Sequence, residues 1–512
     1  MLIKSQPDEI QSFLSDASYI RDGYADRVVL PESAEDVAEI LAAAMRDCTP
    51  VTVSGAGTGT VGGRIAFGGI VLATDRINKI ERVAHDDGNG SAVAGSGVVL
   101  SDLQRSVESE GLLYPPDPTE RSCFLGGTIA TNASGARTFK YGPTRNYVKR
   151  LKVALASGDL LELRRGDLHA EPGGRVEILL DGGRIIRAQL PSYRMPQTRK
   201  NASGYFVLPE MDVIDLFIGS EGTLGVIVEA EVALREKPEG LLSGVLFFKA
   251  QDDLLCFVAE ARSRSLQNRA RGAISLAPTG VNDKASESGG GLDARALEYF
   301  DSQSLGFLRQ KYQTIPDAAQ CAIFFEQETT SKTEDPLMNE WLALLDTNNA
   351  LADSWFATNE PDQAKLREFR HELPVLMNEW FARYQQRKVS TDMAVPDNEF
   401  SGMLRFYETT LQTSGLKYTI FGHIGDNHVH VNILPRDDDE GIKAREIYLQ
   451  FLKRAAAVGG TLSAEHGIGK LKREYLHLFY SDQHLREMAS LKRAFDPAGI
   501  LGRGNIFSEK YL

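Results

Sequence analysis

Apolar residues recur every three to four positions near the start of the chain, at Val37, Ile40, Leu41 and Ala44. This spacing places them on one face of a helix. Ser33 precedes the run and two acidic residues follow it, which is a common arrangement in the first turn of a helix. The pattern predicts a helix from Ser33 to about Cys48.

Short continuous apolar runs predict β-strands in several other places. They lie at residues 51–54, 70–74, 151–155, 177–180, 244–248 and 322–326. Helices are predicted at residues 253–266, 437–458 and 481–495. Strand and helix patterns alternate beyond residue 240, which is typical of an α+β arrangement.

A charged stretch at residues 235–240, broken by Pro238, is the predicted domain boundary. A polar, glycine-rich segment at residues 283–291 is predicted to be a loop without chemistry. Near the C-terminal end, residues 420–423 and 428–434 are predicted to be two strands around a turn. Side chains alternate along a strand, so His428, His430 and Asn432 share one face and apolar residues take the other.

At 512 residues the chain is long enough for two or three domains. Its composition is ordinary for a globular protein, since 42% of the residues are apolar and 25% are charged. The net charge of -13 argues against a nucleic-acid partner, because phosphate neutralisation requires clustered lysine and arginine. A small anionic substrate needs only one or two local cations. That class of ligand stays open.

The four cysteines are scattered and form no C-x-x-C pair, so neither an iron–sulfur cluster nor a cysteine zinc site is predicted. The N-terminus lacks an apolar run of signal-peptide length, and no apolar stretch reaches eighteen residues. We expect a cytoplasmic protein, with peripheral membrane contact and a homodimer left open.

Five glycines fall within residues 55–63, directly after a predicted strand. Glycine lets the backbone approach a ligand and point its N–H groups at phosphate. The loop contains a literal G-x-G-x-x-G from Gly57 to Gly62, which raises a Rossmann nucleotide fold. That fold needs a helix to begin here, and the next strand at Ile70 leaves no room for it. A Rossmann fold is therefore rejected, and a glycine-rich hairpin without a ligand remains the alternative.

Two further segments offer surfaces where backbone can meet a large flat ligand. One runs from a P-D-P sequence at residues 116–118 to the small residues of 125–135, and the other spans residues 216–228. Together with the first loop they suit a dinucleotide better than a lone phosphate.

These segments resemble the FAD-binding domain of the vanillyl-alcohol oxidase and p-cresol methylhydroxylase superfamily, over residues 20–237. The matching motifs are the glycine-rich loop, P-D-P followed by G-G-x-x-A-x-N-A-x-G, and S-E-G-T-L-G-V-I. The resemblance implies a two-domain α+β fold, with a FAD-binding domain at 1–237, a cap domain for substrate at 238–470, and a segment at 471–512 that packs back on the first domain. Residues 54–63 contain no histidine, which some members use to attach the flavin, so we expect non-covalent FAD.

The same resemblance implies a set of FAD-binding residues. They are Gly55, Gly57, Thr58 and Gly59 at the pyrophosphate, and Gly127, Thr128, Thr131, Asn132, Gly135 and Ile227 along the flavin, with Pro115, Glu221, Gly222 and Gly225 completing the set. The segment from Lys200 to Tyr205 resembles the family's K-N-x-x-G-Y and is interpreted as a polar turn without a catalytic part.

Three histidines gather around the predicted turn after residue 420, and a fourth, His466, follows Glu465 later in the chain. His423, His430 and Glu465 make a set of two nitrogens and one oxygen suited to zinc, iron or manganese. Glu465 and His466 would point oppositely in a regular strand, but the glycines that follow relax this constraint. The alternative is a hydrogen-bonded histidine cluster without metal.

This region resembles the C-terminal domain of FAD-linked D-2-hydroxyacid dehydrogenases, which carry G-H-x-G-D-G-N-x-H-x-N and later A-E-H-G-I-G. The resemblance implies a divalent metal, zinc before iron or manganese, on His423, His430 and Glu465, with His466 as the general base. Asn427 and His428 depart from the pattern, so His428 is a further candidate to reach the metal or the substrate.

A substrate carboxylate needs a cation, preferably an arginine that binds both oxygens. Arg370 lies where the family places an R-E-G-like segment, although the match is partial. Lys388 is a weaker candidate, because it is displaced relative to the Asp392 and Pro396 that match a family D-x-x-x-P.

Metal, histidine and flavin together form a complete mechanism. Hydride transfer from a hydroxyl-bearing carbon to flavin is easier when the hydroxyl proton leaves, and a Lewis acid and a neutral histidine promote that loss. The sequence predicts oxidation of a D-2-hydroxy acid of the D-lactate, glycolate or D-2-hydroxyglutarate type. The electron acceptor is then external: a quinone, an electron-transfer flavoprotein, a cytochrome or oxygen. The alternatives are a FAD-dependent oxidase of a larger alcohol and a flavin-binding subunit of a larger redox complex.

Overall fold

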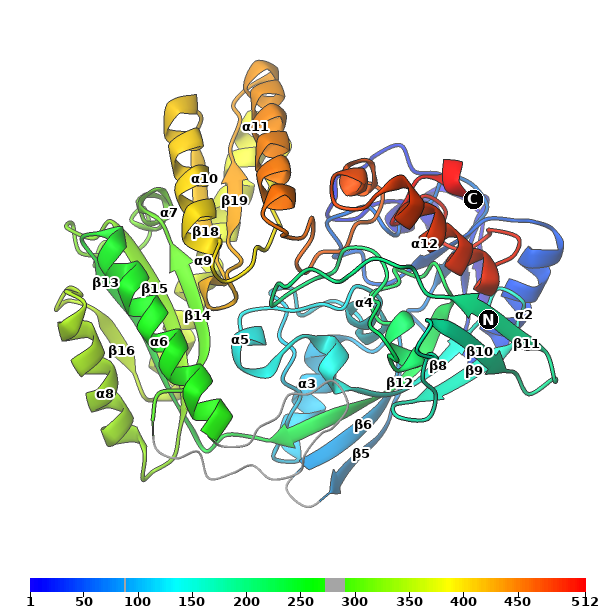
Figure 1. Cartoon of the computed structure of the whole chain (residues 1–512), viewed down its shortest axis with the longest axis horizontal. Coiled ribbons are helices and arrows are strands. Elements are labelled where there is room, and N and C mark those ends of the chain that lie inside the picture. The colour runs from blue at the N-terminus through cyan, green and yellow to red at the C-terminus, as the bar shows by residue number, and fades with distance from the viewer. Residues whose placement is uncertain (87–88, 272–290) are drawn as a thin grey trace.

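The computed structural model describes residues 1–86, 89–271 and 291–512. Most of the glycine-rich segment predicted at 283–291 lies outside the described residues. Figure 1 shows two groups of sheets side by side, with residues 1–236 in one and the seven-stranded sheet in the other. The architecture is the mixed α+β arrangement that the sequence predicts.

The first group begins with a four-stranded sheet in the order β1-β2-β4-β3. These strands are β1 Leu2–Lys4, β2 Arg27–Leu30, β4 Ile70–Ala73 and β3 Val51–Ser54. The predicted helix is α2, Ala34–Arg46, and its Ser33 Oγ accepts a hydrogen bond from the backbone N–H of Asp36 at 3.1 Å. No helix follows β3 before β4, so the rejection of the Rossmann fold is confirmed for these described residues.

A six-stranded sheet stands beside it, in the order β5-β6-β12-β8-β9 with β7 paired to β12. Its strands are β5 Ile80–Asp86, β6 Asn89–Gly95, β12 Val226–Glu236, β8 Val148–Ala154, β9 Leu160–Arg164 and β7 Leu112–Leu113. Val37 and Leu41 of α2 are buried in one cluster with Val51 of the first sheet and Val226 of the second. The helix thus fills the space between the two sheets.

Short helices and a hairpin complete this group. They are α1 Pro7–Ile10, α3 Leu100–Ser109, α4 Leu125–Ala130, α5 Thr138–Tyr141, and the hairpin of β10 Arg175–Leu179 with β11 Ile185–Gln189. The strands predicted at 151–155 and 177–180 correspond to β8 and β10.

The second group is built on an antiparallel sheet in the order β16-β13-β15-β14-β18-β19-β17. Its strands are β16 Trp355–Ala357, β13 Gly240–Phe248, β15 Cys321–Thr329, β14 Ala294–Phe300, β18 Tyr418–Gly422, β19 His430–Ile433 and β17 Val389–Ser390. The strands predicted at 244–248 and 322–326 are confirmed as parts of β13 and β15. The strand predicted at 428–434 is confirmed only over β19, because His428 lies before it, in an isolated β-bridge with Ala394.

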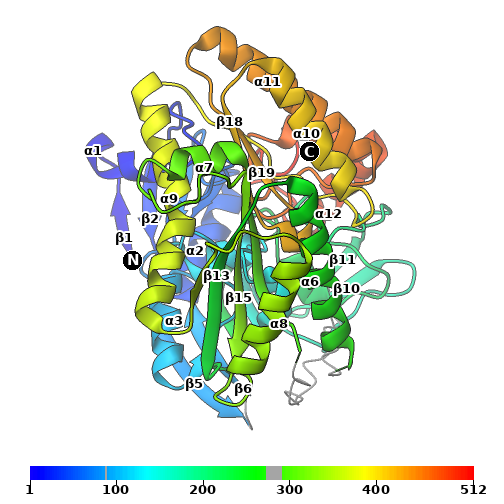
Figure 2. The ribbon, with the colours of Figure 1, turned by 90° about the vertical axis from the view of Figure 1, so that its left-hand side faces the viewer.

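Helices cover both faces of this sheet, as Figure 2 shows on either side of β13 and β15. On one face lie α6 Gln251–Arg271 and α8 Glu334–Thr347, and on the other α7 Ser302–Leu308 and α9 Glu360–Tyr384. Side chains alternate along β13 accordingly. Leu246 and Phe248 belong to the core under α6 and α8, while Val245 and Phe247 join the core under α7 and α9.

The last part of the chain first adds α10 Phe400–Ser414 and α11 Asp438–Ala457, and then returns to the first group. The N–H of Val51 donates to the carbonyl of Ile500 at 2.8 Å, and α12, Asp482–Phe495, lies beside β11. In Figure 1 this segment is red and lies over the blue and green strands of residues 1–236. Residues 461–470 therefore cross from one group to the other, carrying Glu465 and His466.

Among the described residues, none of the helices combines the length and apolarity needed to cross a bilayer.

Candidate active site

A cleft of about 430 Å³ opens between the glycine-rich segments of residues 1–236 and the seven-stranded sheet. The loop between β3 and β4 forms part of its wall. Gly57 has a φ of +81°, and a Cβ there would lie 2.5 Å from the Arg64 guanidinium, whose Nη1 donates to the carbonyl of Gly55 at 2.8 Å. At Gly59 and Gly127 a Cβ would meet no atom within 4 Å. Both positions therefore leave bare backbone open to a ligand.

Most of the predicted FAD-binding residues line this cleft: Gly55, Gly57, Thr58, Gly59, Gly127, Thr128, Thr131, Glu221, Gly222, Gly225 and Ile227. Pro115, Asn132 and Gly135 do not. The Oδ1 of buried Asn132 accepts a hydrogen bond from the N–H of Arg145 at 3.0 Å, and a Cβ on Gly135 would lie 2.0 Å from the carbonyl oxygen of Asp117. Asn132 and Gly135 therefore contact other parts of the protein and do not line the cleft themselves.

Glu221 has a second role that the sequence motif does not reveal. Its carboxylate accepts hydrogen bonds from the N–H groups of Ile468 and Gly469, both at 2.7 Å. Gly467 has a φ of +81°, and a Cβ there would lie 3.0 Å from Glu221 Oε1. Glu221 thus anchors the segment that follows Glu465 and His466 onto the wall of the cleft.

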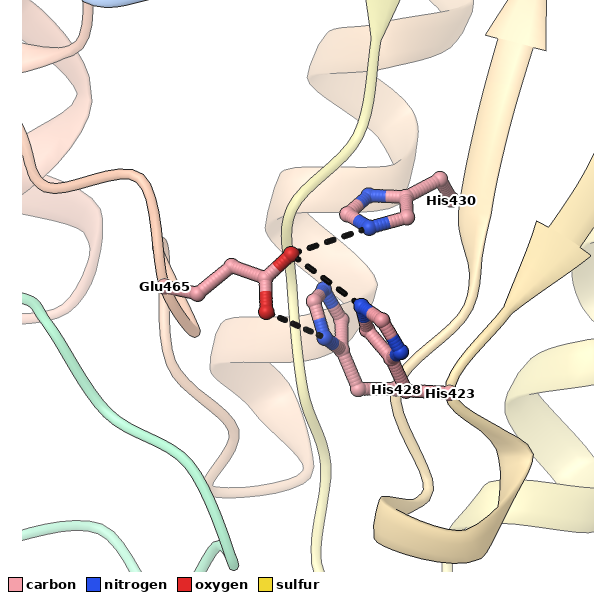
Figure 3. Close-up of side chains that lie close together, drawn as sticks. All are labelled: His423, His428, His430 and Glu465. Atoms are coloured by element: carbon pink, nitrogen blue, oxygen red, sulfur yellow. Dashed lines mark hydrogen bonds and ion pairs between the residues drawn. The ribbon is translucent and has the colours of Figure 1, made fainter. Parts of the chain in front are cut away.

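At one end of the cleft, side chains of β19, of the turn between β18 and β19, and of the 461–470 segment meet. Figure 3 shows the imidazoles on one side of the Glu465 carboxylate. The Nε2 atoms of His423 and His430 lie 3.3 Å and 3.2 Å from the same oxygen, Glu465 Oε1. These separations are close to the roughly 3.3 Å expected between two ligands of a tetrahedral zinc ion.

Both histidines are oriented through their other ring nitrogen. His423 Nδ1 lies 2.7 Å from Glu298 Oε1, and His430 Nδ1 lies 3.1 Å from the carbonyl oxygen of Thr391. When Nδ1 carries the proton and donates to these acceptors, each Nε2 presents a lone pair toward Glu465. Metal-binding histidines have this arrangement, with an outer acceptor fixing the tautomer.

The charges around the cluster favour a cation there. Burial lowers the pKa of His423, but the charges of Glu298 and Glu465 and the hydrogen bond to Glu298 together outweigh it and raise that pKa to about 9. Burial would raise the pKa of Glu465, whereas Lys200 and His423 lower it well below its usual range. A negative, histidine-lined site of this kind is satisfied by a proton or by a divalent metal, so the residues fit the implied metal.

Lys200 belongs to the cluster, although its segment is predicted to be a polar turn without a catalytic part. The side chain is fully buried, and its Nζ lies 3.2 Å from Glu465 Oε2 and 3.4 Å from Asp426 Oδ2. It also donates to the carbonyl of Gly135 at 3.1 Å. The K-N-x-x-G-Y motif was the available signal, but a local motif does not show a partner 265 residues away.

His466 lines the cleft next to Glu465, with a third of its side chain exposed. Its Nδ1 lies 3.3 Å from Asp392 Oδ2, and its Nε2 lies 3.7 Å from Glu465 Oε1. Asp392 is held in turn by Lys472 Nζ at 2.7 Å. Burial lowers the pKa of His466 to about 4, with Asp392 opposing the shift, so the ring is neutral near pH 7. A neutral imidazole can accept a proton.

Arg370 does not line the cleft. Its Nε and Nη2 both donate to Glu298 Oε2, at 3.0 Å and 2.9 Å, and its Nη1 lies 2.9 Å from His371 Nε2. The guanidinium is thus already paired with the carboxylate that orients His423. The predicted contact of Arg370 with a substrate carboxylate stays a prediction. In this conformation the Nε and Nη2 edge of the guanidinium is occupied by Glu298 and is not available to bind both oxygens of a substrate carboxylate.

Lys388 does line the cleft, together with His430 and His466. No hydrogen bond or ion pair links its ammonium to another of the described residues. The Lys388 residue is exposed, so its ammonium is open to a ligand. Lys388 is the cation best placed to meet an anionic ligand.

Two protein families match the chain. Residues 25–164 match the family described as FAD binding domain, and residues 285–506 match FAD linked oxidases, C-terminal domain. A solved structure of alkyldihydroxyacetonephosphate synthase superposes with a TM-score of 0.66 at 16% identity, covering 98% of this chain and 82% of its own. At that identity the likeness supports the fold alone.

Curated relatives match almost end to end. The chain is 28% identical to the glycolate oxidase subunit GlcD of Bacillus subtilis, over 94% of this chain and 89% of that protein. It is 29% identical to a D-lactate dehydrogenase of Anaerostipes hadrus, over 98% and 93%.

The open position at Gly127 gives a direct test of where the cofactor lies. Replacing Gly127 by valine should weaken FAD binding by about tenfold or more, because the side chain would occupy space against the ligand. Titration of the flavin-free protein with FAD measures the effect. Gly402→Val, at another helical glycine whose Cβ would meet nothing within 4 Å, is the matched control and should leave FAD affinity unchanged. Equal affinities for both variants would place FAD elsewhere.

Proposed function

Because the chain belongs to the FAD-linked oxidases, we propose that it oxidises a D-2-hydroxy acid of the D-lactate, glycolate or D-2-hydroxyglutarate type to the 2-oxo acid. One observation carries the proposal: a single cleft is lined both by the glycine-rich segments and by His430, Glu465 and His466. A molecule held in this cleft next to a flavin is also next to the histidine cluster.

In this proposal residues 1–237 bind FAD without a covalent bond, residues 238–470 provide the substrate and metal site, and residues 471–512 pack back on the FAD-binding part. FAD supplies the acceptor for a hydride. The open backbone at Gly59 and Gly127 lets the protein approach the cofactor closely. The electron acceptor is an external quinone, electron-transfer flavoprotein, cytochrome or oxygen, and we leave a homodimer open.

His423, His430 and Glu465 hold a divalent metal, with zinc favoured over iron or manganese. Their ligand atoms already lie close together and both imidazoles have outer acceptors. The metal supplies a Lewis acid that lowers the pKa of a substrate hydroxyl. Arg370 contributes at a distance, because it pairs with Glu298 and so keeps His423 in its orientation.

His466 takes the hydroxyl proton. Asp392 contacts Nδ1, which keeps the proton of the neutral ring on that nitrogen and leaves Nε2 as the acceptor. The hydride leaves from the carbon that bears this hydroxyl. The substrate thus loses one proton from oxygen and one hydride from carbon, and a 2-oxo acid results. Glu465 Oε1 lies 3.7 Å from this Nε2, so the proposed base borders the proposed metal ligands.

Lys388 binds the substrate carboxylate in this account. It lines the same cleft as His430 and His466 and pairs with no acidic group among the described residues. An ammonium pairs with a carboxylate as a compact point charge, and a small 2-hydroxy acid needs no more than one such partner.

The substrate class is tested by anaerobic flavin reduction. D-lactate, glycolate, D-2-hydroxyglutarate and D-malate are added in turn to the FAD-loaded protein, with the L-enantiomers of the chiral acids as controls. At least one D-acid or glycolate should bleach the flavin absorption much faster than the L-acids do. If none does so, the hydroxy-acid assignment fails.

The role of His466 is tested separately. His466→Asn should slow flavin reduction by about 10²- to 10⁴-fold, because the proton acceptor is lost, while FAD content stays unchanged. Stopped-flow reduction and the flavin-to-protein absorbance ratio measure the two effects. His484→Asn, on α12 outside the cleft, is the control. A parallel loss of FAD and of rate in His466→Asn would mark a structural role.

A further inference from the structure

We infer that His428 is a fourth protein ligand of the metal, joining His423, His430 and Glu465. The inference rests on the proposed metal site and extends it from two imidazoles to three. His428 is also where the chain departs from the G-H-x-G-D-G-N-x-H-x-N pattern that it resembles, because a histidine stands in place of the usual asparagine.

The position of the ring supports ligation through Nδ1. His428 Nδ1 lies 4.0 Å from Glu465 Oε2 (Figure 3). The other two histidines face the other oxygen of this carboxylate, Oε1. One ligand atom from each of the four residues lies within 4.8 Å of every other. Four ligands of a tetrahedral zinc ion are about 3.3 Å apart, so small side-chain movements would gather all four on one ion.

The second ring nitrogen of His428 has an outer partner, like those of its neighbours. Its Nε2 lies 3.2 Å from Asp392 Oδ1. Glu298 takes this part for His423, and the carbonyl of Thr391 takes it for His430. All three imidazoles thus have one nitrogen toward an outer oxygen and the other toward Glu465, which is the arrangement of histidines around a protein-bound metal.

Burial explains why a ligand is needed. His428 is fully buried, and its Nδ1 has no hydrogen-bond partner among the described residues. Its Nε2 faces Asp392 at 3.2 Å without meeting hydrogen-bond geometry. A buried polar group without a partner costs roughly 1–3 kcal/mol. Histidine in an apolar core normally satisfies at least one nitrogen. A metal at Nδ1 would satisfy this ring, whereas an asparagine could not reach as far.

Three imidazoles and one carboxylate change what the site can do. The additional nitrogen shifts the donor set further toward zinc and other imidazole-binding metals. Four protein ligands also fill a tetrahedral shell, so a substrate oxygen would enter as a fifth ligand. Asp392 connects this ligand to the proposed base, because its other oxygen lies 3.3 Å from His466 Nδ1.

A second arrangement competes for the same metal. Asp392, His430, Glu465 and His466 also place ligand atoms within 4.8 Å of one another. A metal there would use His466 and leave His428 unbound. The two arrangements share His430 and Glu465 and differ in the other two ligands, which are His423 and His428 in the first and Asp392 and His466 in the second. The first therefore has three imidazoles and the second has two.

The test counts imidazoles on zinc in the FAD-loaded protein by X-ray absorption spectroscopy, and measures zinc affinity by competition with a chelator. The wild-type protein should show three imidazoles. His428→Asn should show two and bind zinc roughly tenfold or more weakly, with FAD content unchanged. His466→Asn should keep three, and His85→Asn, on the exposed β5 strand, is the control for an unrelated histidine.

Each other outcome has a distinct meaning. Two imidazoles in the wild-type protein, with the same count and affinity in His428→Asn, would overturn the inference and leave the proposed function intact. A loss of one imidazole in His466→Asn but not in His428→Asn would overturn it in favour of the second arrangement. Wild-type protein that retains no zinc, iron or manganese would instead remove the metal from the proposed function. Because the wild-type count needs no variant, poor folding of His428→Asn would not obscure the result.

Discussion

The buried Glu465 carboxylate is the interaction on which the site depends. Groups from both parts of the chain converge on it: Ser134 Oγ donates at 3.0 Å and Lys200 Nζ lies at 3.2 Å from the FAD-binding side, while His423 and His430 approach from the seven-stranded sheet. A buried charge without partners costs several kcal/mol, so each of these contacts constrains where the two parts can sit. Glu221 adds a second constraint, because it holds the backbone just after Glu465 against the cleft wall.

Local patterns predict those features of the site that are close in sequence. Alternation along residues 428–434 places His430 on a strand, and the glycines of residues 55–63 predict a loop that a ligand can approach. The family resemblance identifies FAD as the cofactor and explains why the two features belong to one protein.

Long-range partners could not be predicted in the same way. Glu298 orients His423 from 125 residues earlier, because β14 and β18 pair with Tyr299 opposite Gly422. Nothing in the sequence around Glu298 indicates that register. Arg370 illustrates the same limit, since its residue type suits a substrate carboxylate but the fold pairs it with Glu298. The role of Lys200 could not be predicted either, because a lysine in a polar turn gives no sign that its ammonium will be buried.

In the proposed mechanism the histidine cluster and the flavin act on one substrate within one cleft. This mechanism is tested most directly by comparing flavin reduction in FAD-loaded protein before and after the divalent metal is removed by chelation. The metal-depleted protein should keep its FAD but be reduced by the hydroxy acid at least about 100-fold more slowly, and zinc should restore the rate. Reduction at the full rate without metal would contradict the mechanism.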